Sequence, residues 1–133
     1  MKHEIIGDNQ QMVKIDLQPG EGIVAEAGAM VNMSGNMAME SQLKGGIFAG
    51  LKRAVTGDSI FLTRFTARDT EGFVSFAGTM TGKIFMVRLI PEKEFVAQKS
   101  SFLCCEESVN LDIAFTQKIR AGFLAARGLS SSG

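Results

Sequence analysis

The sequence predicts an all-β domain: a β-sandwich or short double-stranded β-helix with an internal pseudo-repeat. Apolar and polar residues alternate with a period of two along most of the chain, as in "MVKIDL" and "SVNLDIAF". The 133 residues include 15 glycines and only 2 prolines, a balance that suits tight turns and bulges. A strand-turn-strand pattern also occurs twice in the chain. Apolar residues make up 45% and charged residues 21% of the chain, a composition that is neither disordered nor membrane-spanning.

The predicted elements are short strands with one helical interruption. We predict strands over 12–17, 23–27, 30–34 and 37–44, separated by the turns "QPGEG" and "GN". Gly45 and Gly46 predict a sharp bend, because paired glycines permit backbone angles closed to other residues. One short helix is then expected near 47–55, and Gly57 terminates it. Further strands are predicted over 59–67, 73–78, 83–90, 94–100, 101–106 and 108–115.

The phase of the alternation predicts which side chains form the core. The residues expected to be largely buried are Met33, Met39, Phe61, Phe85 and Leu111. On this interpretation Phe85→Ala costs roughly 3–5 kcal/mol of stability. Four methionines fall between positions 30 and 39, and they are interpreted as core filler rather than as copper ligands.

The two copies of the strand-turn-strand pattern can be aligned. Val31-Asn32-Met33 matches Val109-Asn110-Leu111, 78 positions later. Lys44 and Gly46 match Arg120 and Gly122, 76 positions later, so the alignment needs a two-residue gap. We therefore expect one domain over 1–133, with an incomplete second pseudo-repeat at about 102–127 and a flexible tail over 129–133.

Charge is balanced over the whole chain but not along it. The 14 basic and 14 acidic residues give a formal net charge of zero, which makes nucleic acid an unlikely partner. Residues 44–68, however, carry a local basic excess. The candidate interaction patch for an anionic membrane surface or an acidic protein consists of Lys52, Arg53, Arg64 and Arg68. The alternative is that the helical turn packs on the sheet and its basic pair is merely solvated.

The sequence indicates no catalytic, cofactor or metal site. His3 is the only histidine and lies near a chain end, which argues against Ser-His-Asp or Cys-His machinery. The glycine-rich segment has Leu51 where a phosphate-binding loop requires lysine. We therefore predict a non-enzymatic protein that uses no cofactor.

Cysteine usage and the absence of export signals predict the compartment. Cys104 and Cys105 are expected to be reduced and unbridged, with at most one readily alkylated, since adjacent strand residues point to opposite faces. No apolar run reaches the roughly 18 residues of a membrane span. The N-terminus lacks the apolar core of a signal peptide. The expected location is the cytoplasm, with or without peripheral contact to a membrane.

The assembled pieces resemble a known family. "QPGEGIVAEAGAMVNMSGNMAME", "KGGIFAGLKRAVTGDSIFLTRF", "GKIFMVRL", "FVAQKSSFLCCEESVNLD" and "KIRAGFL" occur in the order seen in the bacterial branch of the "altered inheritance of mitochondria" family. That family was formerly catalogued as a domain of unknown function. The resemblance covers Leu17 to about Arg127, and it implies a fold like that of the tryptophan RNA-binding attenuation protein. It implies no established activity, and the mitochondrial relatives suggest a role in organising membranes.

Two functions follow as expectations. The first is a scaffold or interaction module that forms a homo-oligomer, because joining subunits is one way to cover exposed sheet edges. The second is an RNA- or small-ligand-binding oligomer, which rests on fold analogy alone.

Overall fold

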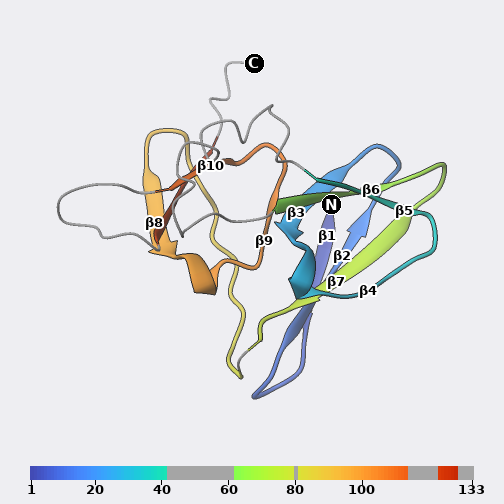
Figure 1. Ribbon diagram of the computed structural model, residues 1–133, viewed down its shortest axis with the longest axis horizontal. Helices are drawn as coiled ribbons and strands as arrows, with labels where there is room; N and C mark the ends of the chain where they lie inside the picture. The colour runs from blue at the N-terminus through green and yellow to red at the C-terminus, as the bar shows by residue number, and fades with distance from the viewer. Residues whose placement is uncertain (42–61, 80, 114–122, 129–133) are drawn as a thin grey trace.

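The computed structural model describes residues 1–41, 62–79, 81–113 and 123–128, and these residues are mostly β-strands (Figure 1). The predicted all-β class is confirmed. Two short 3-10 helices interrupt the strands, η1 (Ala27–Ala29) and η3 (Lys99–Ser101). The strands are β1 (Lys2–Ile6), β2 (Met12–Leu17), β3 (Gly22–Glu26), β4 (Met30–Met33), β5 (Met37–Ser41), β6 (Leu62–Ala67), β7 (Gly72–Ala77), β8 (Glu94–Gln98), β9 (Cys104–Glu106), β10 (Asn110–Ile113) and β11 (Phe123–Arg127).

Some predicted features lie outside the described residues. These are the bend at Gly45 and Gly46, the helix near 47–55 and its stop at Gly57. They stay predictions.

In the described part of the chain the strands form three sheets, and the strands of each sheet pair antiparallel. The first sheet has the order β1-β2-β7-β4, the second β5-β6-β3-β9, and the third β10-β11-β8. Strand β9 crosses from the C-terminal part of the chain to pair with β3, in the register Val24 to Cys105. The two parts of the chain therefore share the second sheet.

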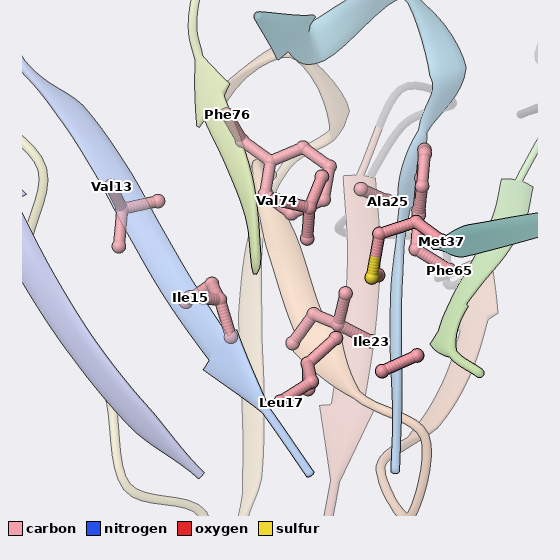
Figure 2. Packing of buried hydrophobic residues seen from close by; sticks show 10 residues of the cluster. Val13, Ile15, Leu17, Ile23, Ala25, Met37, Phe65, Val74 and Phe76 are labelled. Carbon is pink, nitrogen blue, oxygen red and sulfur yellow. The ribbon is translucent and has the colours of Figure 1, made fainter. Parts of the chain in front are cut away.

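The main core lies between the first and second sheets (Figure 2). Alternate residues of β2 point into it, because side chains of a strand alternate between its two faces. The rings of Phe65 on β6 and Phe76 on β7 meet edge to face, with centroids 5.3 Å apart. The buried members are Val13, Ile15, Leu17, Ile23, Ala25, Met37, Phe65, Ala67, Val74 and Phe76.

A smaller core lies on the opposite face of the second sheet. Val24 of β3 lies between two residues of the main core and therefore points the other way. There it packs with Leu62, Leu111 and Leu124. Strand β3 is thus buried on both faces, which accounts for its nearly continuous apolar sequence.

The predicted internal repeat is present. The series β3, η1, β4, β5, β6 recurs in the same order as β8, η3, β9, β10, β11. In the first copy β6 lies between β5 and β3, and in the second β11 lies between β10 and β8. Up to the end of β5, equivalent residues are 72 positions apart, as Gly22 is from Glu94 and Ala27 from Lys99.

Backbone hydrogen bonds fix this register independently. Met37 N donates to Ser34 O over 3.2 Å, and 72 positions later Val109 N donates to Glu106 O over 3.0 Å. The turn before β3 closes with Glu21 N to Gln18 O, and the turn before β8 with Lys93 N to Ile90 O, again 72 positions on. Each of these two turns has proline in its second position, Pro19 and Pro91.

The sequence alignment of the repeat was therefore wrong in register. At 72 positions Val31 corresponds to Leu103, and Val109 corresponds to Met37, so the match at 78 positions was a coincidence of three residues. The repeated strands also begin with β8, earlier than the predicted residue 102. A match of three similar side chains is weaker evidence for the register of a repeat than the hydrogen-bonded turns between its strands.

The core predictions had mixed outcomes. Leu111 is buried, as predicted, and Met33 is half-buried. Met39 and Phe85 were predicted wrongly, since both are exposed. Met39 lies on β5, the edge strand of the second sheet. Phe85 lies in a segment that forms no strand. Phe61 lies outside the described residues.

Candidate interaction surface

The segment 84–90 exposes most of its apolar side chains, although Ile84 packs against the main core and Leu89 is half-buried. Phe85 is 76% exposed and Met86 67%, and Val87 and Ile90 are also exposed. The neighbouring Lys83 and Arg88 are exposed as well. Contiguous exposed apolar side chains of this kind mark contact surfaces more often than scattered single ones do. We call this segment the apolar surface segment.

Both ends of the apolar surface segment are anchored. At its start, Gly82 N donates to Asn9 O over 2.9 Å, and Ile84 N donates to the Gln11 side-chain oxygen over 2.7 Å. At its end, a Cβ built on Gly128 would lie 3.1 Å from Leu89 O, so these two backbones pack closely. Figure 1 draws the stretch between β7 and β8 as coil without an arrow. The segment is thus held at its ends, and between them it pairs with no strand among the described residues.

The repeat explains why this segment is apolar. It lies 72 positions after β2, so Phe85 corresponds to Val13, which is 5% exposed, and Leu89 corresponds to the fully buried Leu17. Strand β2 has β1 on one edge and β7 on the other. The second copy has the residue pattern of such a central strand but no ladder of its own. Without neighbours the same pattern leaves Phe85 in solvent.

Strand β8 shows the same deficiency at its outer edge. In the first copy β3 pairs with both β6 and β9, whereas the equivalent β8 pairs, among the described residues, with β11 alone. Phe95 of β8 is accordingly 40% exposed, while its counterpart Ile23 is 3% exposed. Two uncovered features, the segment and this edge, therefore follow one another in the chain.

Only Arg64 and Arg68 of the predicted basic patch lie among the described residues, and their surroundings differ. The guanidinium Nε of Arg64 donates to the carboxylate of Glu107, and both side chains are partly exposed. This hydrogen bond is the chief cause that raises the pKa of Arg64. Arg68 lies in the exposed turn after β6, with its N–H bonded to Asn36 O over 3.0 Å. Lys52 and Arg53 lie outside the described residues, so the patch as a whole stays a prediction.

The turn that carries Arg68 is held firmly. The side-chain amide of Asn36 donates to the carbonyls of Arg68 and Thr70, each over 3.1 Å. Ser34 ties the other side of the turn by accepting from Phe73 N over 3.0 Å. Arg68 is therefore presented from a fixed backbone.

Cys104 and Cys105 are free thiols on β9, as the sequence predicted. Burial raises the pKa of Cys104 to about 12. The pKa of Cys105 is raised as well, first by burial and then by the neighbouring Cys104 and Glu106. Thiols of this kind are poor nucleophiles at neutral pH.

Within residues 1–41, 62–79, 81–113 and 123–128, no three His, Cys, Asp or Glu side chains gather where they could hold a metal ion. Over the same ranges no helix has the length and apolar character needed to cross a bilayer. The surface that stands out in the described part of the chain is therefore apolar and strand-like.

Sequence reasoning detected the apolar character of 83–90 but interpreted it as a core strand. The signal that would have corrected this was the pair of proline turns 72 positions apart, "QPGEG" and "IPEKE". They align the segment with β2 and show which neighbours it would need.

Fold and surface together define an all-β sandwich protein with an uncovered strand-like segment. The sequence matches the family described as mitochondrial biogenesis AIM24 over residues 3–132, and the chain belongs to that family. The family resemblance stated from the sequence is thereby confirmed. The likeness to the tryptophan RNA-binding attenuation protein stays a prediction.

One solved structure has a fold similar to that of this chain. The chain is similar to a Streptococcus pyogenes protein determined by a structural genomics consortium, with a TM-score of 0.75 and 25% sequence identity. The match covers 96% of this chain and 61% of that protein, so the chain spans about three fifths of its relative's length. None of the curated proteins gives a significant match.

Proposed function

We propose that this protein is a non-enzymatic interaction module that associates with further copies of itself through the apolar surface segment. The observation that carries the proposal is the exposure of Phe85, at 76%, in a segment whose counterpart in the first copy is a core strand. The removal of apolar side chains from water is the main driving force for association, and aromatic side chains contribute most. A scaffold that works as a homo-oligomer fits this surface.

Contact with an anionic membrane is the second candidate. Lys83 and Arg88 flank the exposed Phe85 and Met86, a combination that suits the boundary between headgroups and acyl chains. The predicted basic patch, with Lys52 and Arg53, would add to such binding. RNA or small-ligand binding finds no comparable support, because the segment offers only one aromatic ring, that of Phe85.

The test removes apolar area from the segment without touching the core. The solution mass of the parent is measured by light scattering beside that of a Phe85→Ser, Met86→Ser double variant. Val31→Ser serves as control, because Val31 is also exposed, at 51%, but belongs to β4 and not to the segment. Co-sedimentation with phosphatidylglycerol and with phosphatidylcholine vesicles is measured for the same three proteins.

We expect the parent and the Val31→Ser control to be oligomeric and the double variant to be monomeric, with circular dichroism unchanged. A parent that stays at the monomer mass of 14.3 kDa and ignores both kinds of vesicle would contradict the proposal. A monomeric parent that sediments with phosphatidylglycerol vesicles only, and loses this in Lys52→Glu with Arg53→Glu, would establish the membrane candidate instead. Nucleic acid retained through purification would show in the ultraviolet absorbance spectrum and would contradict both.

A further inference from the structure

We infer that the partner of the apolar surface segment is the same segment of a second copy of this chain. The two segments would pair as antiparallel strands about a twofold axis at Val87. This inference rests on the proposed function and names the partner that the proposed surface takes.

The described part of the chain offers no neighbour for the segment from within. Strand β2 has the flanking strands β1 and β7. The counterpart of β1 in the second copy would begin at residue 74, which already belongs to β7. Strand β7 cannot serve as a neighbour of the segment, because β2 and β4 pair with its two edges. An exposed, strand-like segment with unpaired backbone N–H and C=O groups is a template for pairing with a second strand.

The faces of the segment select the register. By equivalence with β2, one face carries Phe85, Val87 and Leu89 and the other carries Ile84, Met86 and Arg88. In an antiparallel pair, residues directly opposite each other share a face. Only registers that join residues of the same face keep the apolar face continuous, and the most central of these sets Val87 opposite Val87. Phe85 of one copy then lies opposite Leu89 of the other.

Charge favours this antiparallel pairing of identical segments. In this register Lys83 of each copy lies opposite Pro91 of the other, one position from Glu92. A parallel pair would instead set Lys83 beside Lys83 and Arg88 beside Arg88, which is unfavourable. The formal net charge of zero also leaves no overall repulsion between copies.

The experiment reads the register by disulfide cross-linking under copper-phenanthroline and air. A residue opposite itself can bridge to its copy, because facing Cβ atoms of an antiparallel pair come within bridging range. Val87→Cys should therefore give a covalent dimer. Thr81→Cys is the matched control, since Thr81 is exposed but lies before the segment. The parent, which retains Cys104 and Cys105, is treated alongside to measure background from those thiols.

A second reading checks the neighbouring positions. Phe85→Cys and Leu89→Cys should each stay largely monomeric alone and should form a mixed covalent dimer when combined. An oligomeric parent in light scattering, together with Val87→Cys that cross-links no more than Thr81→Cys, would overturn this pairing and leave the proposed function standing. A monomeric parent would overturn both.

Discussion

Phe65 and Phe85 show how far the same residue type can differ within this fold. Phe65 is fully buried against Phe76, whereas Phe85 is 76% exposed. The cost first expected for Phe85→Ala therefore belongs to Phe65. We expect Phe65→Ala to lower the free energy of unfolding by about 3–5 kcal/mol, because it opens a cavity and removes the edge-to-face contact.

Urea denaturation of the two variants Phe65→Ala and Val31→Ala measures this effect. Val31→Ala should change stability by no more than about 0.5 kcal/mol, since Val31 is exposed. Equal midpoints for the two variants would show that the core has been assigned to the wrong strand faces.

The two thiols carry a prediction about pH. In the folded protein the pKa of Cys104 is about 12 and that of Cys105 is raised too, while the thiols of the unfolded chain ionise near their ordinary value of about 9. Above that pH the unfolded state binds fewer protons than the folded state, so stability falls as pH rises from about 9 toward 12. The chain has no tyrosine whose ionisation would obscure this effect.

We expect the urea midpoint to fall between pH 9 and 11, and less steeply in a Cys104→Ala, Cys105→Ala variant. Iodoacetamide at pH 8 should modify both thiols at least about tenfold more slowly in the folded protein than in urea. Equal rates in the two conditions would mean that β9 leaves the thiols open to solvent.

At the scale of elements, the β1–β2 hairpin depends on a glycine. Gly7 has a φ of 110°, and a Cβ there would lie 2.5 Å from the backbone oxygen of Gln10. Gly20 also has a positive φ, 87°, but a Cβ there meets nothing within 4 Å. Gly7→Ala therefore combines backbone strain with a clash that only the backbone can relieve, while Gly20→Ala has the strain alone.

We expect Gly20→Ala to cost about 1–2 kcal/mol and Gly7→Ala clearly more. Gly28→Ala, at an open position without positive φ, should be close to neutral. Thermal or urea unfolding of the three variants gives the order directly. Gly7→Ala as stable as Gly28→Ala would contradict the hairpin geometry.

Most strands could be predicted because one of their faces is buried. Period-two alternation located β2, β6 and β7, whose alternate residues reach the core. It missed β1, which is exposed along its whole length and so carries no apolar pattern, and it missed β11. The alternation of apolar and polar residues reveals neither the pairing partners of a strand nor its exposure to solvent. For this reason 83–90 was predicted as a core strand.

The candidate surface could be predicted even less well than the fold. The sequence marked basic residues, but charge alone does not reveal that Arg64 is bonded to Glu107 from the loop after β9. The exposed segment resembled a core strand because its residues are those of one. What distinguishes the two is whether a neighbouring strand is present, and that is a property of the topology.

At the scale of the whole molecule, the two copies of the repeated unit differ in how many of their strands have neighbours on both edges. Among the described residues, β2 and β3 of the first copy have strands on both edges, whereas 84–90 has none and β8 pairs along one edge alone. Association that buries these features stabilises the folded state by mass action.

The thermal midpoint of the parent should therefore rise with protein concentration, while that of the Phe85→Ser, Met86→Ser variant should not. A parent midpoint independent of concentration would contradict association through folded copies.

The most direct test of the central claim is hydrogen exchange of the backbone amides of residues 84–90 as a function of protein concentration. An unpaired segment exchanges freely, whereas a strand paired with a second copy is protected. We predict that alternate amides of this segment gain protection as the protein associates, while those of β2 are protected throughout. Free exchange at 84–90 at every concentration, in a protein whose mass has nevertheless doubled, would contradict the account.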